Sequence, residues 1–171
     1  MGSTEAAGAP PTTSSTSAAL AIPERSRSSW FDVVKRTPTL VFDAEAHAQG
    51  WCQYGIADSL DLKHGREYRK NPPAPAKWRI ACIFVDKNHR GEGIARMALG
   101  GAISQIVLAG GGRIEAIAET TLGRNAQGRF LFSGTVELFE DLGFTRVRQV
   151  GKHAWIVSRT VKAGAKSTSR E

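Results

Sequence analysis

Hydrophobic and polar residues alternate along the first half of the chain in patterns typical of short strands and one interrupted helix. Thr39–Asp43 and Gly50–Gly55 are rich in β-branched and aromatic residues, which predicts two strands joined by a turn. Residues 57–70 have a helical pattern that Gly65 interrupts. Three prolines between positions 72 and 75 then exclude regular structure up to Lys77.

The clearest pattern covers residues 78–118. The apolar run 78–85 predicts a central strand buried on both faces. A polar loop follows, and small and apolar residues then recur at helical spacing from Ile94 to Ala109. Three glycines at 110–112 are typical of a helix end, and residues 113–118 predict the next strand. This segment therefore predicts a strand–loop–helix–strand unit.

The last third of the chain predicts one short helix and two strands. Residues 135–144 have a helical pattern that Gly143 closes. Residues 147–150 and 153–161 are strand-like and flank a turn at Gly151. Together with the preceding elements they indicate a single mixed α/β (α+β) domain.

Low-complexity sequence sets the expected domain bounds. Residues 1–29 are rich in Ser, Thr, Ala and Pro, which predicts a disordered arm. The domain is expected over 30–162, with a flexible tail over 163–171. The first residues lack the pattern of a secretory signal, and no apolar run is long enough to span a bilayer. A cytoplasmic protein without a membrane partner is expected.

Charge and cysteine content narrow the chemistry. The net charge of +7 and the pI of about 9.8 favour anionic ligands in general. The two cysteines, Cys52 and Cys82, lie in apolar stretches, which predicts reduced thiols. The four histidines are scattered, so no metal site is predicted.

The loop 86–93 has the features of a phosphate-binding site. It joins the end of a strand to the start of a helix, where backbone N–H groups lack intrahelical acceptors and the helix dipole is positive. Gly91 and Gly93 allow the main chain to approach an anion closely. Lys87, Arg90 and Arg96 add positive charge around the same point. A diphosphate is the predicted ligand.

The pattern Arg90-x-x-Gly93-x-Ala95 resembles the Q/R-x-x-G-x-G/A signature of GNAT acyltransferases. Residues 138–144, LFEDLGF, resemble a second recurrent phrase of that family, L-Y-E-K-L-G-F. The similarity covers 78–161 well and 39–56 loosely. It implies a mixed, mostly antiparallel, splayed sheet flanked by helices, with acetyl-CoA as acyl donor and an amine, of a small molecule or of a protein, as acceptor.

The resemblance also implies which residues bind the acyl donor. The splayed strand would present main-chain groups to the pantetheine arm, and a backbone N–H near Val85 would polarise the thioester carbonyl. The diphosphate would lie on the backbone amides of the loop and of the first helical turn. The resulting set of donor-binding residues comprises Ile83, Phe84, Val85, Arg90, Gly91, Glu92, Gly93, Ile94, Ala95, Arg96 and Phe139.

Catalytic residues are less well defined, because Phe139 stands where the family often has a tyrosine that protonates the leaving thiolate. Ser133 or Thr135, a water, or unassisted departure of the thiolate are the alternatives. Glu119, at the end of a strand, is the first candidate for the general base, and Glu115 is the second. Tyr54 and His64 are further candidates for the acceptor pocket.

The amino-terminal part is abbreviated, because the family usually has a strand and two helices before the residues that match 39–56. The acceptor wall is then reduced, or a partner subunit supplies it in a homodimer. Acceptor contacts are expected from 57–77 and from 120–133.

Three other functions compete with the acyltransferase hypothesis. A dinucleotide-binding oxidoreductase is disfavoured because Arg96 replaces the third glycine of that fingerprint. A nucleic-acid-binding protein lacks a supporting pattern of stacking aromatics. A GNAT-like domain that binds acyl-CoA without transferring the acyl group is the main alternative.

Overall fold

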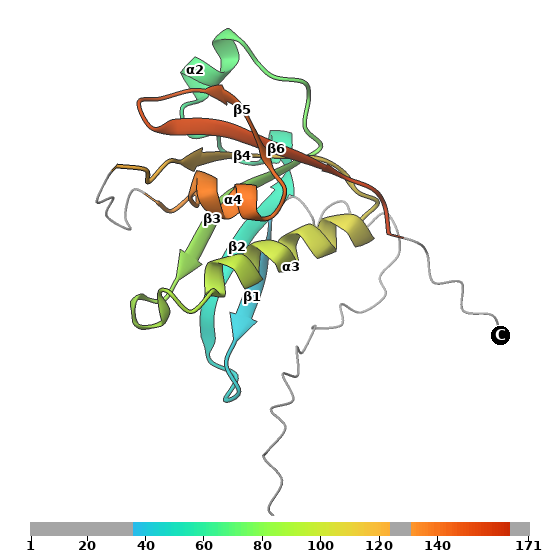
Figure 1. The fold of residues 1–171 in the computed structure, drawn as a ribbon. Coiled ribbons are helices and arrows are strands. Elements are labelled where there is room, and N and C mark those ends of the chain that lie inside the picture. Colours follow the sequence, from blue (N-terminus) through green and yellow to red (C-terminus); the bar gives the residue numbers. More distant parts are fainter. Residues whose placement is uncertain (1–35, 124–130, 165–171) are drawn as a thin grey trace, which may run out of the picture.

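The computed structural model describes residues 36–123 and 131–164. They form one six-stranded sheet in the order β1-β2-β3-β4-β6-β5, with helices packed against it (Figure 1). The strands and helices are β1 (Thr37–Phe42), β2 (Ala48–Ile56), α2 (Gly65–Lys70), β3 (Trp78–Val85), α3 (Ile94–Leu108), β4 (Gly112–Glu119), α4 (Val136–Asp141), β5 (Thr145–Gln149) and β6 (Ala154–Val161). None of the helices in these ranges is long and apolar enough to cross a membrane.

The sheet is mixed and mostly antiparallel, as expected. Strands β1, β2 and β3 are antiparallel neighbours, and β4, β6 and β5 form a second antiparallel group. The two groups meet at β3 and β4, which are parallel. The crossover through α3 explains this parallel pair. Helix α3 returns the chain to the end of the sheet where β3 begins, so β4 runs in the same direction as β3.

Strands β3 and β4 separate soon after they meet. They are paired only where Trp78–Ile80 lies beside Ile114–Ala116. On the other side of β3, Gln53 pairs with Cys82 whereas Tyr54 pairs with Ile80, so Ala81 is an extra residue in β3. Such a bulge bends a strand, and this one lies where the two strands diverge. The predicted splayed sheet is therefore confirmed.

The main chain of Phe132–Gly134 lies in the gap between the two strands. The Ile83 N–H donates to the Phe132 carbonyl at 2.6 Å, and the Glu119 N–H donates to the Gly134 carbonyl at 3.1 Å. The loop before α4 therefore bridges the splayed strands and satisfies part of their exposed main chain.

The main core lies between the sheet and one layer of helices. Helix α3 packs on β1, β2 and β3, and α4 packs near β4, β5 and β6 on the same face (Figure 1). Small residues allow close contact: a Cβ atom at Gly101 would lie 2.6 Å from Thr39 Cγ2. The largest fully buried side chains of this core include Trp78, Ile80, Leu99, Ile106, Ile114, Val136, Phe139 and Val157.

The opposite face of β4 and β6 is covered by the segment that contains α2. Leu62 and Tyr68 pack there against Ile117 and Ile156. Beneath them lies the buried carboxylate of Glu115.

Glu115 belongs to a buried polar network. The Arg79 guanidinium forms an ion pair with its carboxylate at 2.5 Å, and the Tyr68 hydroxyl donates to the same carboxylate at 2.9 Å. Arg79 also donates to the carbonyls of Ala57 and Leu60, which fixes the chain that leads to α2. The network is therefore structural, and it ties the segment 57–68 to the sheet.

Several local predictions needed correction. Only the first half of β3 is buried on both faces, since Phe84 in the splayed half is 49% exposed. The helix expected over 57–70 is a 3₁₀ turn, Ala57–Ser59, followed by α2, which Gly65 begins rather than interrupts. Met97 is one of the apolar residues that recur at helical spacing between Ile94 and Ala109, which predicted an inward-facing side chain, but it is 51% exposed.

The remaining elements agree with the sequence patterns to within a few residues. The prolines at 72–75 lie in a segment without helix or strand, and the glycines at 110–112 all have positive φ. Both cysteines are free thiols. The predicted arm, 1–29, and most of the predicted tail, from 165 onward, lie outside the described residues.

Candidate active site

The loop after β3 is organised by its own backbone and by one aspartate. Asp86 accepts a hydrogen bond from the Asn88 N–H at 2.8 Å and so caps a 3₁₀ turn, Lys87–His89. The chain then reverses through Gly91 (φ 86°) and Gly93 (φ 79°) before α3 begins at Ile94. L-residues rarely adopt these φ values, so both glycines are required by the path of the chain.

This path leaves a cluster of amide groups without protein acceptors. Within the described residues, the N–H groups of 91–95 have no hydrogen-bond partner, and the first helical bond runs from Met97 to the Gly93 carbonyl at 3.0 Å. A Cβ atom at Gly91 or Gly93 would meet nothing within 4 Å. The space on the side-chain side of these two glycines is therefore open. Together with the positive end of the α3 dipole, it suits an anion.

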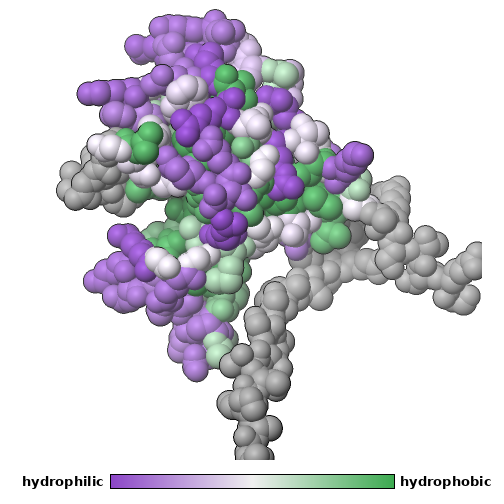
Figure 2. Space-filling view, viewed as in Figure 1, coloured by the Kyte–Doolittle hydropathy of each residue, from purple (hydrophilic) through white to green (hydrophobic). Residues whose placement is uncertain are grey.

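The charged side chains near the amides differ in their partners. Arg96 forms an ion pair with Asp141 of α4, and His89 Nδ1 lies 3.2 Å from a carboxylate oxygen of Glu92. Arg90 and Lys87 are exposed. In Figure 2 this hydrophilic loop protrudes, and the surface is indented between it and the part of the molecule that carries α4. Arg96 therefore links the start of α3 to α4, while Arg90 and Lys87 supply positive charge at the loop itself.

Of the three residues predicted in the splayed strand, Val85 alone has a main-chain N–H available on the splayed side. The Ile83 N–H points to that side but donates to Phe132. The Asp86 N–H donates to the Gln49 carbonyl of β2. N–H groups two residues apart in a strand point to the same side, so the Phe84 N–H also points toward β2. Of the three predicted main-chain contacts with the acyl donor, only the one at Val85 therefore has a free N–H on the splayed side.

Phe139 lies in the core rather than on a surface. It is fully buried and packs edge-on against Phe144, with ring centroids 5.0 Å apart. Its ring packs close to Gly134, in the segment that lies between the splayed strands. A Cβ atom at Gly134 would lie 2.9 Å from the Phe139 ring and 3.0 Å from Ile83 Cδ1. Contact between Phe139 and an acyl donor stays a prediction, and its role in the structure is packing beneath the gap.

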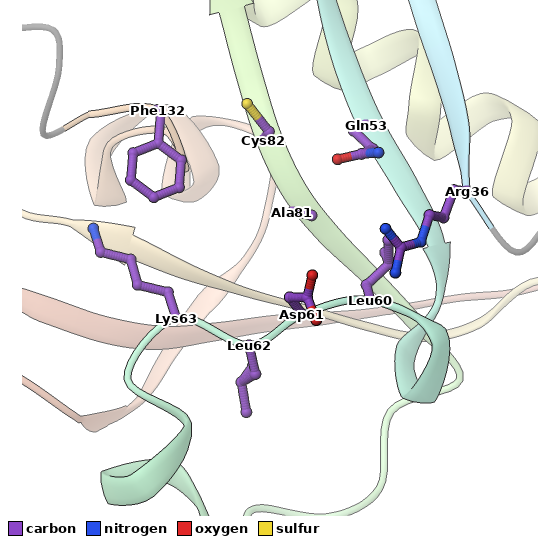
Figure 3. Close-up of a pocket in the computed structure, with 9 residues that line it drawn as sticks. All are labelled: Arg36, Gln53, Leu60, Asp61, Leu62, Lys63, Ala81, Cys82 and Phe132. Carbon is purple, nitrogen blue, oxygen red and sulfur yellow. The ribbon is translucent and has the colours of Figure 1, made fainter.

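A cavity of about 510 Å³ opens on the face of the sheet opposite α3 (Figure 3). Its wall consists of one residue before β1, side chains of β2 and β3, the segment 60–63, and one residue of the loop before α4. These residues are Arg36, Gln53, Leu60, Asp61, Leu62, Lys63, Ala81, Cys82 and Phe132. Two of these segments, 60–63 and Phe132, fall within the ranges where acceptor contacts were expected from the sequence.

Lys63 and Glu119 form an ion pair at one side of the cavity. The Lys63 Nζ lies 2.8 Å from Glu119 Oε1 and 4.8 Å from the centre of the Phe132 ring. The glutamate side chain is 11% exposed and the lysine side chain 25%. Glu119, the first candidate for the base, is therefore held at the splay by a lysine that sequence reasoning did not select.

Ser133 is buried at the splay, and its hydroxyl has no hydrogen-bond partner in the described part of the chain. Thr135 is different, because its hydroxyl accepts from the Leu138 N–H at 3.2 Å and caps α4. Of the two hydroxyls that the sequence offered, Ser133 is thus the one with unused donor capacity. Glu115, the second candidate for the base, is engaged by Arg79 and Tyr68.

Tyr54, His64 and Cys82 have no evident catalytic role in the structure. Tyr54 is buried against Trp78 in the core and does not line the cavity. Burial raises its pKa to about 12, so the phenol stays neutral. His64 is the N-cap residue before α2, with a left-handed φ of 56°, and its ring lies close to the turn at Gly151. Cys82 does line the cavity, but burial raises the pKa of its thiol. It is therefore a weak nucleophile.

No family model matches the sequence, and no curated protein matches it. Solved structures do resemble the fold. An acetyltransferase from Thermus thermophilus has 17% identity over 74% of this chain, with a TM-score of 0.46. This chain spans 64% of that structure.

Two further similar structures carry the GNAT description. A GNAT superfamily phosphinothricin acetyltransferase from Sinorhizobium meliloti, in complex with AcCoA, has 13% identity over 85% of this chain and 71% of its own, with a TM-score of 0.48. A GCN5-related N-acetyltransferase from Kribbella flavida has 16% identity over 84% of this chain and 82% of its own, with a TM-score of 0.49. By its splayed sheet, its glycine loop before α3 and the two matching sequence phrases, the described part of this chain has a GNAT-like fold.

Proposed function

We propose that the protein is an acetyl-CoA-dependent N-acetyltransferase that transfers the acyl group directly to an amine. The observation that carries this proposal is the run of five amides, 91–95, that have no acceptor within the described residues at the start of α3, beside two glycines with open space around them. The Arg90-x-x-Gly93-x-Ala95 pattern supports the assignment of a diphosphate to that cluster. When bound, acetyl-CoA supplies an activated thioester.

The residues of the splay would position and move protons. The Val85 N–H, on the open side of β3, would donate to the acyl carbonyl oxygen. Glu119 would accept the proton that an incoming ammonium must lose before nitrogen can attack. Ser133 has a buried hydroxyl without a partner, so it can donate to a departing thiolate without losing another bond.

The cavity lined by 60–63 and Phe132 would hold the acceptor. It lies on the face of the sheet away from α3, so donor and acceptor would approach the splay from opposite sides. Asp61 and Lys63 place charges of both signs in its wall, and Phe132 adds an aromatic surface. An amine with an apolar body suits this lining.

The proposal is tested in two stages. Calorimetric titration with CoA is expected to show binding, and thiol release from acetyl-CoA with a panel of small amines and lysine peptides is expected to show turnover. Ser133→Ala should lower kcat without changing CoA affinity. Thr39→Val is the matched control, because it also removes a buried hydroxyl without a partner, but under α3. Absence of CoA binding by the folded protein would refute the proposal.

A second candidate is a domain that binds acyl-CoA without transferring the acyl group. Phe139 favours it, because a buried aromatic ring without a hydroxyl stands where the family often has its proton donor. The same two measurements separate the candidates: tight CoA binding with no thiol release across the whole panel would favour the binding protein.

A further inference from the structure

Lys63 occupies an unusual position for a lysine. Its side chain is three-quarters buried in the cavity wall, and its amine points at the Phe132 ring in Figure 3. The same amine is 2.8 Å from the Glu119 carboxylate, which lies at the end of β4 beside the splay. The Phe132 carbonyl in turn accepts from Ile83 within the gap between the strands. An amine of the protein itself is thus fixed at the place proposed for the acceptor amine.

Other lysines in the described part of the chain lack this combination. Lys70 pairs with Glu67 on the surface and is 65% exposed. Lys77 lies over Trp78, at the far end of β3 from the splay. Lys63 alone among them both lines the cavity and pairs with a carboxylate that is mostly buried.

We propose that Lys63 is a self-acetylation site, the first amine to receive the acyl group when no external acceptor fills the cavity. This inference rests on the proposed function. Lys63 would give one proton to Glu119, and its neutral nitrogen would form a bond to the acyl carbon as the carbon–sulfur bond of the thioester breaks. As proposed for an external amine, Ser133 would donate its proton to the thiolate, and the serine would take up the second proton of the nitrogen. The products are acetyl-lysine, free CoA thiol and one proton, which Glu119 releases to solvent.

The ion pair and the confinement of the side chain supply the physical reason. An amine held beside a carboxylate and a bound thioester reacts as a unimolecular system, which raises the effective concentration of the amine by orders of magnitude. Lys63 also has little freedom to leave, because its stem lies against the cavity wall and its charge is paired.

The test is peptide mass spectrometry after incubation of the protein with isotope-labelled acetyl-CoA and no acceptor. The label is expected on Lys63 at least about tenfold faster than on Lys70, with a rate that does not depend on protein concentration. An amine-reactive ester that needs no binding site, N-hydroxysuccinimidyl acetate, should reverse the order, since Lys70 is the more exposed side chain. Equal labelling of the two lysines by acetyl-CoA would overturn the proposal.

Three variants complete the design. Lys63→Arg keeps the positive charge and cannot be acylated, so its melting temperature should match that of the wild type while the label disappears from position 63. Glu119→Gln should slow labelling of Lys63 and leave that of Lys70 unchanged. Gly93→Asp should remove the preference for Lys63 at a donor concentration near the wild-type Kd, because it weakens CoA binding.

The outcomes separate the two proposals. CoA binding and acetylation of external amines without label on Lys63 would overturn the self-acetylation inference and leave the proposed function intact. Failure of the folded protein to bind CoA would overturn both.

Discussion

Gly93 offers the sharpest test of the anion site, because one substitution there changes charge with little change in packing. A Cβ atom at this position would meet nothing within 4 Å, so a side chain enters open space beside the amides. The left-handed φ of 79° costs about 1 kcal/mol for a residue other than glycine, and Asn and Asp tolerate it best. Gly93→Asn and Gly93→Asp therefore form a matched pair that differs only in charge.

The difference between the two variants follows from Coulomb's law. A carboxylate about 5 Å from a unit of phosphate charge, at an effective dielectric constant near 40, costs about 1.7 kcal/mol. A diphosphate carries about two such charges, so Gly93→Asp should weaken CoA binding relative to Gly93→Asn by about 3 kcal/mol, roughly a hundredfold in Kd. The effect should shrink as salt is added, because an exposed site is screened.

Calorimetric titration with CoA measures the effect, and circular dichroism with thermal melting establishes that both variants are folded. The wild type should bind tightest, Gly93→Asn next, and Gly93→Asp least or not at all. If both folded variants bind CoA with equal affinity, the diphosphate does not lie on these amides, and the site assignment is wrong.

Three other predictions concern stability. Arg79→Met should lower the free energy of unfolding by about 3–5 kcal/mol in a denaturant titration, because it leaves the Glu115 carboxylate buried without its cation; a loss below about 1 kcal/mol would contradict the network. Phe139→Ala should cost a similar amount, about 3–5 kcal/mol, by opening a cavity in the core, while leaving measurable CoA binding to the folded fraction. Since the pKa of Tyr54 is raised to about 12 against 10.0 for an unperturbed phenol, its contribution to stability is complete below pH 10 and falls as pH rises toward 12. Absorbance at 295 nm should show no ionisation of Tyr54 near pH 10 until the protein unfolds.

The strands, α3 and the glycine loop could be predicted from sequence because their signals are local. The strand-forming residues of 39–43, the apolar run that begins at Trp78 and the helical spacing after Ile94 each span one element. The glycines at 91 and 93 act on their own φ angles, so the anion site is determined within about ten residues. A binding site formed by backbone amides can therefore be recognised from a short stretch of sequence.

The splay and the cavity could not be predicted in the same way. The bulge at Ala81 depends on register with β2. The insertion of Phe132–Gly134 between β3 and β4 depends on contacts with Ile83 and Glu119, which precede their partners by 49 and 15 residues. Met97 shows the limit of periodicity, because its helical spacing predicts burial whereas its side chain is 51% exposed. No local pattern reports such long-range packing.

The same division applies to function. On the proposed mechanism the donor is held by backbone amides at the start of α3, whereas the acceptor meets side chains from 60–63 and Phe132, which the sheet brings together from distant parts of the chain. Substitutions at Asp61 or Phe132 should therefore change the KM for an amine and its ranking within a panel, while the Kd for CoA stays unchanged. Gly93→Asp should do the reverse and weaken CoA binding without changing the ranking of amines at saturating donor. Correlated changes in both parameters for Asp61→Asn would show that donor and acceptor share one binding surface, and would contradict an approach from opposite faces of the sheet.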